Sequence, residues 1–183
     1  MTGENGEDGR ASLRPHHRLS YDVFCTTHER AWRAVARARL HEDALVERAV
    51  RGMKADLWRE WELALRESVP ACYAWMLIKA RIADLLLETG LAAQPPRAVL
   101  PDWIVALDLE ESAALRDYDR LYEAILRLSD RQYDALVLRQ LLGLDHRVVA
   151  DYLGLTEAGA RTTAGQGLAK VHRLLGIETG EGR

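Results

Sequence analysis

The stretch 129–175 carries three helix-start signals in close succession, and it constrains the fold more than any other part of the chain. The three predicted N-caps are Ser129, Asp145 and Thr156. Ser129 is followed three residues later by Gln132, the spacing at which each side chain can satisfy the backbone N–H of the other residue. Gly143 and Gly154 are expected to end the first two helices, because glycine enters the left-handed conformation without a Cβ clash. The pattern therefore predicts three helices joined by very short turns.

The second and third of these helices have the spacing of a helix-turn-helix unit. Ala150 is small where the two helices would cross, Gly154 lies at the turn, and Ala160 falls where the second helix packs back. Two short helices joined by a glycine-containing turn can place the second helix in a DNA major groove. The alternative is an ordinary packing corner, since small residues before turns are common in helical hairpins. The preceding helix, over 130–142, and the matched caps favour a DNA-binding module.

The residues before this unit also show helical periodicity, and no strand-like alternation of useful length occurs anywhere. Helices are predicted from Tyr21 to Arg39 with Ser20 as cap, over 41–67 and over 71–89. Prolines then indicate a linker, although Trp103 is one of several apolar residues there that should dock on a domain. We expect an all-α protein, in which an N-terminal helical bundle is joined by a linker to a C-terminal helix-turn-helix domain. The expected division is a disordered tail at 1–18, the bundle at 19–89, the linker at 90–110, the helix-turn-helix domain at 111–176 and a tail at 177–183.

Composition and charge narrow the function classes. Of 183 residues, 48% are apolar and 29% charged, as in soluble globular proteins. A protein that held DNA alone would usually be basic, so the net charge of −3 indicates help from a partner. No phosphate-binding loop, nucleophile elbow or metal-binding His/Glu helix occurs, so we expect no catalytic residues, no metal and no cofactor.

The two cysteines and the hydropathy pattern bear on location. Cys25 and Cys72 lack metal-ligand spacing and are predicted to be reduced thiols. The sequence has no apolar run of the ~18 residues that span a membrane and no secretion signal. These observations predict a cytoplasmic protein that does not bind a membrane.

Three segments carry a family resemblance: 121–132, 148–157 and 73–81. With the two-domain plan, they make the chain similar to a bacterial sigma factor of the extracytoplasmic-function type. The first resembles the Leu-Pro-x-Arg-Gln-like opening of the family's region 4, and the second resembles its Glu-Ile-Ala-x-x-Leu-Gly-x-Ser-Glu core. The third resembles the Trp-Leu-x-x-Ile-Ala-Arg segment of region 2, which in the family contacts the promoter −10 element and helps to melt it.

The resemblance implies core RNA polymerase and promoter DNA as partners, with an anti-sigma factor as a further candidate. Residues expected at the −35 element are Thr156, Arg161, Thr162, Thr163, Gln166 and Lys170. Residues expected at the −10 element are Trp75, Lys79 and Arg81, and residues expected at the polymerase are Glu47, Arg51 and Lys54. Arginine reads guanine edges or phosphates and glutamine reads adenine edges. The alternative for each −35 residue is a solvated polar face, and for Trp75 a place in the core.

The sequence also departs from the family pattern. After Arg81 the family continues with Asn and basic residues, whereas this chain continues with the mostly apolar run 82–87. The segment 47–50 keeps the acid of the family's Asp-x-x-Gln polymerase motif and loses the amide. Three glycines, at 159, 165 and 167, fall within the predicted recognition helix, where each costs about 1 kcal/mol relative to alanine.

The leading hypothesis is a sigma-like transcription initiation factor that binds core polymerase and directs it to promoters through −10 and −35 contacts. The first alternative is a degenerate sigma-fold co-regulator or interaction protein that binds polymerase or a partner without melting promoters. The run after Arg81 and the glycines near Gln166 favour this alternative. The second alternative is a self-sufficient helix-turn-helix repressor, which would have to dimerise.

Overall fold

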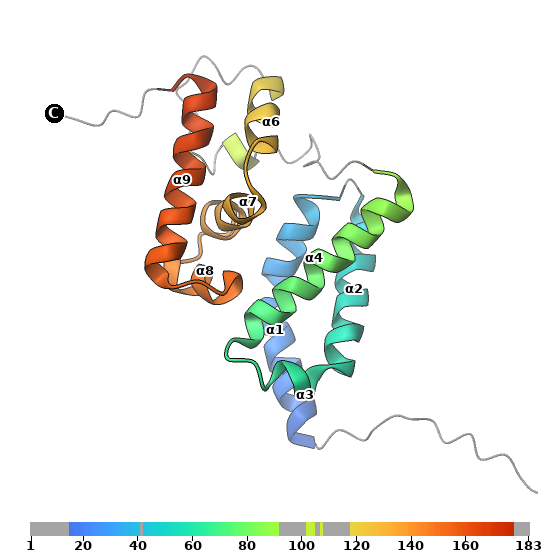
Figure 1. Cartoon of the computed structure of the whole chain (residues 1–183). Helices are drawn as coiled ribbons and strands as arrows, with labels where there is room; N and C mark the ends of the chain where they lie inside the picture. The colour runs from blue at the N-terminus through green and yellow to red at the C-terminus, as the bar shows by residue number, and fades with distance from the viewer. Residues whose placement is uncertain (1–14, 41, 92–101, 105–106, 108–117, 178–183) are drawn as a thin grey trace, which may run out of the picture.

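The computed structural model describes residues 15–40, 42–91, 102–104, 107 and 118–177, and these residues form helices and turns without a strand. The all-α prediction is therefore confirmed. Figure 1 shows two helical units, one drawn in blue to green and the other in yellow to red, with α7 and α8 lying between α9 and the first unit. Among the described residues, no helix combines the length and the apolar character needed to cross a bilayer.

The N-terminal bundle buries large aromatic and aliphatic side chains between its helices. Its elements are α1 (Pro15–Arg37), α2 (Asp43–Arg59), α3 (Trp61–Ala64) and α4 (Pro70–Thr89). The α1, α2 and α4 helices pack against one another. Trp32, Met53 and Ile78 are completely shielded from solvent at their centre. Each such side chain contributes about 1.5–3 kcal/mol through burial, which fixes α4 as a rigid support.

The first helix begins earlier than the sequence indicated. It starts at Pro15, inside the stretch predicted as tail, and Ser20 is not its cap. Proline is tolerated in the first helical turn, where its missing N–H would have no partner in any case. The Ser20 hydroxyl instead donates to the carbonyl of His17 at 2.9 Å and accepts from the indole N–H of Trp61 at 3.2 Å.

The helix predicted over 41–67 is interrupted. The backbone of Glu60 leaves helical geometry, with φ −107 and ψ 14, and separates α2 from α3. The interruption lets Trp61 pack against α1, with its ring centroid 5.4 Å from that of Tyr21 and 5.0 Å from that of Phe24. Trp61 lies four residues after Leu57 on the apolar stripe of this segment, and its burial follows that periodicity although the helix is interrupted.

The C-terminal unit has the predicted order of capped helices. Its elements are α6 (Tyr118–Leu126), α7 (Asp130–Leu136), η3 (Val137–Leu141), α8 (His146–Leu153) and α9 (Glu157–Leu175). The capping box is present: the Ser129 hydroxyl accepts from the Gln132 N–H at 3.3 Å, and the Gln132 side chain accepts from the Ser129 N–H at 3.2 Å. Asp145 caps α8 by accepting from the Val148 N–H at 2.9 Å. Local sequence therefore fixes where these helices begin.

The predicted helix 130–142 differs from the structure in its second half. From Val137 the chain forms a π-helical turn, η3, in which the N–H of Leu142 bonds the carbonyl of Val137 at 3.1 Å. The wider turn admits one extra residue per hydrogen-bonded ring. All residues over 133–138 are buried, so this part of the chain is enclosed on every side.

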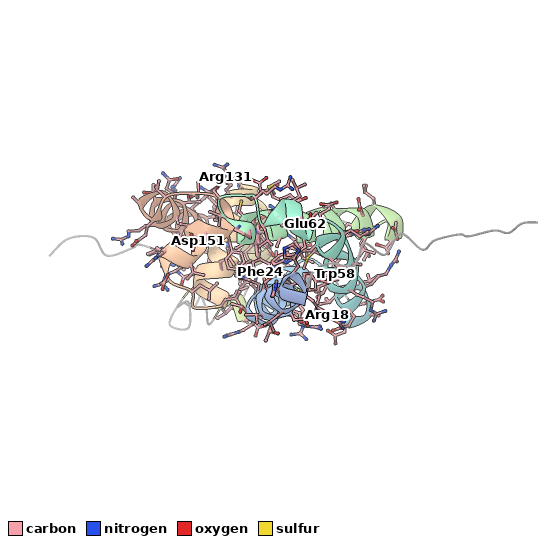
Figure 2. All side chains as sticks on the ribbon, turned by 90° about the horizontal axis from the view of Figure 1, so that it is seen from below. Arg18, Phe24, Trp58, Glu62, Arg131 and Asp151 are labelled. Carbon is pink, nitrogen blue, oxygen red and sulfur yellow. The ribbon has the colours of Figure 1, made fainter. Side chains whose placement is uncertain are left out.

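The two units share one apolar core. The α4 helix packs against α8, and α1 packs against η3. Trp103, from the predicted linker, is fully buried with its ring 5.6 Å from that of Tyr133. Figure 2 shows the molecule from below, with Asp151 of α8 on one side and Phe24 and Trp58 of the N-terminal bundle on the other.

Candidate nucleic-acid interface

A tight turn sets the angle between α8 and α9. Gly154 ends α8 with φ 62, in the left-handed region that favours glycine. The N–H of Leu155 then bonds the carbonyl of Ala150 at 3.0 Å. The Thr156 hydroxyl accepts from the Gly159 N–H at 3.1 Å and starts α9. This geometry is that of a helix-turn-helix unit, with α9 in the place of the second, groove-reading helix.

One face of α9 is buried against the rest of the C-terminal unit. Its buried residues are Ala160, Ala164, Gly167, Val171 and Leu175. A Cβ on Gly167 would lie 3.3 Å from atoms of both Gln132 and Leu136, so this glycine permits a close crossing of α9 and α7. One of the three glycines in the recognition helix therefore has a packing reason.

The opposite face of α9 is open to solvent. Its exposed residues include Ala158, Arg161, Thr162, Gly165, Gln166, Ala169 and Arg173. The Arg161 guanidinium lies 3.1 Å from the Glu157 carboxylate, and both side chains are more than half exposed. Such exposed pairs contribute little free energy, so Arg161 can exchange this partner for a nucleic acid. A Cβ on Gly165 would meet nothing within 4 Å.

Three of the six residues predicted for the −35 contact share this exposed face: Arg161, Thr162 and Gln166. Arg173 joins them, and sequence reasoning missed it, although it follows Gln166 by two helical turns. The other three predicted residues make contacts within the chain. The hydroxyl of Thr163 donates to the Gly159 carbonyl at 2.8 Å, and the Lys170 ammonium donates to the Arg127 carbonyl just after α6. The Thr156 hydroxyl serves as the cap already described.

The residues predicted for the −10 contact lie elsewhere. Trp75 is 3% exposed, and its indole N–H lies 3.4 Å from Oδ2 of Asp134 in α7. The Lys79 ammonium lies 2.6 Å from the same oxygen. Arg81 instead pairs with Asp56 inside the N-terminal bundle. The structure therefore brings two of the three predicted residues to one carboxylate of the other unit.

The residues predicted for polymerase binding belong to a network of charges on α1 and α2. Glu47 pairs with Arg33, which also lies 2.8 Å from Glu29, and Glu29 lies 3.0 Å from Lys54. Hydrogen bonds from Lys54 and Arg33 hold the pKa of Glu29 below its usual value, and Arg33 does the same for the pKa of Glu47. Arg51 is exposed beside this network. The network joins two helices and presents both signs of charge to solvent.

Asp134 is the central site residue that sequence reasoning did not identify. Among the described residues, it is the one with a polar or charged side chain that is buried, at 3% exposure. Its neighbours 135–138 form a continuous apolar run, which indicates that this segment is buried on all sides. A buried carboxylate needs a charged or hydrogen-bonding partner, so the run also indicates a partner for Asp134. The partner itself lies 55 residues away in sequence and could not be deduced from local pattern.

No group of three or more His, Cys, Asp or Glu side chains within the described ranges is arranged to hold a metal ion. Cys25 is buried and Cys72 is half-buried, and both are free thiols.

Comparison with known families identifies one match. Residues 118–171 match the family described as sigma-70, region 4. The matched range runs from the start of α6 into the last part of α9, and it includes the caps and the turn described above. No curated protein and no solved structure matches the chain.

Proposed function

Because residues 118–171 are a region 4 domain of the sigma-70 family, we propose that the chain is a sigma factor that directs core RNA polymerase to promoter DNA. The region 4 match supports a sigma-like role in transcription initiation. The finer proposal is that α9 enters the major groove of the −35 element. The N-terminal bundle would bind core polymerase and the −10 element.

The observation that carries this proposal is the division of α9 into two faces. Its buried residues pack on α6, α7 and α8, while Arg161, Thr162 and Gln166 lie on the exposed side. An arginine and a glutamine on one helix face can both form bidentate contacts with base edges in a major groove. An amphipathic surface helix also has a polar face, so the residue types on this face and the position of α9 after the capped turn carry the proposal.

The charge of the chain indicates why a partner is needed. Affinity for DNA comes largely from neutralising phosphates, and this chain has a net charge of −3. The exposed face of α9 also includes Glu157 beside Arg161. We therefore propose that polymerase supplies most of the DNA affinity, and that α9 adds position and base preference.

The test measures binding to core bacterial RNA polymerase first, and promoter selection second. Duplexes with a randomised upstream window are selected with the polymerase complex, and the selected duplex is used to compare variants. Arg161→Ala should weaken binding of the complex about tenfold or more, since a bidentate arginine–base contact contributes about 1–3 kcal/mol.

Arg59→Ala is a matched control for this experiment. Arg59 and Arg161 are 68% and 67% exposed, and each pairs with an acid on its own helix. The control should bind the duplex as the wild type does. Failure to bind core polymerase at micromolar concentration would contradict the proposal, as would equal behaviour of the two variants.

A second candidate function has its own supporting observation. Trp75 and Lys79, the residues expected to contact the −10 element, are engaged by Asp134. A sigma-fold co-regulator would bind polymerase in this form without opening a promoter. Permanganate footprinting distinguishes the two, because reactive thymines at the promoter bubble would exclude the co-regulator.

A further inference from the structure

An apolar stripe runs along the exposed face of α4, with members three and four residues apart. They are Tyr73, Met76, Ala80, Ala83 and Leu87. This spacing places all five on one side of a helix. Met76 is 62% exposed and Leu87 is 82% exposed, and both alanines are exposed as well. The stripe is therefore an apolar surface that solvent reaches over most of its length.

The opposite side of α4, which faces the bundle, is apolar too. Its buried residues are Ala71, Ala74, Trp75, Ile78, Ile82, Leu85 and Leu86. A helix that is apolar all round is ordinarily buried all round. In Figure 1, however, α4 crosses in front of α1 and α2, and no other helix is drawn over it. Within the described part of the chain, the stripe thus remains uncovered.

The chemistry of the stripe favours another apolar helix as its occupant. None of its members carries a charge, so the phosphates of a nucleic acid would find no partner on it. Helices that lie on membrane surfaces flank their apolar face with lysine and arginine, whereas the exposed charges nearest to this stripe on α4 are Asp84 and Glu88. Alanines at its centre let a second helix approach to about 8–10 Å between axes. Exposed apolar patches of this kind mark contacts between proteins.

The stripe has the same pattern when it is read in reverse. From Met76 to Leu87 the spacings are four, three and four residues, with a large side chain at each end and alanine at both inner positions. Two such helices laid antiparallel about a two-fold axis match each other: Met76 meets Leu87 of the second copy, and Ala80 meets Ala83 of the second copy. A two-fold contact requires this self-complementarity, because the same surface serves both subunits. A contact with a different protein does not require it.

The surroundings of the stripe also suit a second copy. The pairing brings Tyr73 to the end of α4 in the second copy, at Gly90, where a Cβ would meet nothing within 4 Å. On the α2 side, the stripe borders a groove whose lining includes Arg48 and Arg59 together with Asp84. Two-fold symmetry sets this groove against its own copy, and a lining with both signs of charge can be complementary to itself.

We propose that α4 is a homodimerisation helix: two copies of the chain pair antiparallel through Met76, Ala80, Ala83 and Leu87. The inference goes beyond the proposed function, because it depends on neither polymerase binding nor promoter binding. It concerns the face of α4 that the C-terminal unit leaves open. In the dimer, each copy removes the apolar stripe of the other from water, which is the driving force for association.

The length of the stripe predicts a weak dimer. Residues 73–90 span about 26 Å of helix at 1.5 Å per residue. One helix pair of that length buries less surface than the ~1,600 Å² of a standard protein–protein interface. We therefore expect a dissociation constant on the order of 10–100 µM.

Sedimentation velocity of the full chain measures this association, at concentrations from about 1 to 300 µM, which bracket the expected constant. The wild type should change from monomer to dimer across this range. Leu87→Lys should raise the dissociation constant at least tenfold, because each dimer would bury two added charges. Leu19→Lys is the matched control, since Leu19 is a 67% exposed leucine of α1 outside the stripe, and it should associate as the wild type does.

Two further substitutions test the antiparallel register. Ala80→Glu sets a carboxylate opposite Ala83 of the second copy, and Ala83→Lys sets an ammonium opposite Ala80 of the second copy. Each single variant should dimerise about tenfold less tightly than the wild type, because its charge is buried without a partner. The double variant should dimerise more tightly than either single variant, because opposite charges then face each other. In a parallel pairing each charge would meet its own kind, and the double variant would be the weakest.

A wild-type chain that stays monomeric over the whole range would overturn the proposal. Dimers that Leu87→Lys leaves intact, or that Leu19→Lys disrupts, would also overturn it, because the second copy would then dock elsewhere. A double variant no tighter than the single variants would refute the antiparallel pairing through these residues.

Binding to core polymerase separates this inference from the proposed function. If the chain is monomeric and Leu87→Lys weakens polymerase binding while Leu19→Lys does not, the stripe faces polymerase and the homodimer is refuted. A chain that dimerises as described but does not bind polymerase would refute the proposed function and support the dimer.

Discussion

Two faces of this protein were expected to contact promoter DNA, and the fold treats them in opposite ways. On α9, Arg161 and Gln166 lie on the solvent side of a helix whose other side is fully packed. On α4, Trp75 and Lys79 are turned toward the second unit and share the Asp134 carboxylate. The difference shows that a polar or aromatic residue expected to bind DNA can be exposed on one helix and covered on another. Whether a residue is available depends on what packs over it.

The largest expected difference between the two faces is in folding stability. Trp75→Ala should lower the free energy of unfolding by about 4 kcal/mol, because it removes a buried aromatic side chain. Arg161→Ala should change it by less than about 0.5 kcal/mol, as surface substitutions usually do. Urea unfolding followed by circular dichroism measures both. Equal effects would show that the two faces do not differ in packing.

Trp75→Phe refines this comparison. It keeps an aromatic ring beside Tyr152 but removes the indole N–H that Asp134 accepts. The cost should be about 1 kcal/mol, the range for a single hydrogen bond in a protein. A cost as large as that of the alanine variant would mean that the hydrogen bond, and not ring packing, dominates at this position.

A smaller difference is expected between the two sides of α9 itself. Gly167→Val should destabilise the chain by about 2 kcal/mol, because added atoms would press on Leu136. Gly165→Ala should stabilise it by up to about 1 kcal/mol, since the position is open and alanine favours helix. Thermal unfolding of the two variants gives the signs directly. The same sign for both would contradict the assignment of buried and exposed faces.

The smallest expected effect is a pH dependence of stability that comes from His28, where α1 meets α8. Burial lowers the pKa of His28, against an opposing contribution from the charge of Asp151. The unfolded chain therefore takes up a proton near pH 6.5 that the folded chain resists, and stability from this group is lost as pH falls through that range. The urea midpoint of the wild type should fall between pH 7.5 and 5.5 more than that of His28→Phe.

His16→Asn is the matched control variant, because it removes an exposed histidine from the same helix. A His28→Phe variant with the full wild-type pH dependence would show that the titrating group lies elsewhere. The affinity of α9 for DNA should be the same in His28→Phe and the wild type, since His28 contacts Tyr152 of α8 and not the exposed side of α9.

Features that depend on a few neighbouring residues were predictable from the sequence. The caps at Ser129, Asp145 and Thr156 and the left-handed glycines at 143 and 154 are all found as expected. Each rests on hydrogen bonds or dihedral preferences within about four residues, which sequence displays directly. The same holds for the exposed face of α9, where helical spacing places Arg161, Thr162 and Gln166 together.

Features that depend on distant parts of the chain were not predictable in the same way. The start of α1, the interruption at Glu60 and the π-turn at 137–141 all differ from the expected helices. The interruption and the turn accompany residues that become buried against other elements. Helix propensity and periodicity describe one segment at a time, so they do not report contacts between segments that are distant in the sequence.

The sequence by itself determined the all-α fold class and the caps of the helix-turn-helix. It also determined which residue types lie on the exposed face of α9. Only the tertiary structure decided that Trp75 and Lys79 face inward, because their partner Asp134 lies on another helix far along the chain. A helix repeats its own periodicity whether or not another element covers it. Which side chains remain accessible is fixed by the packing of whole units, where burial of apolar surface outweighs local preference.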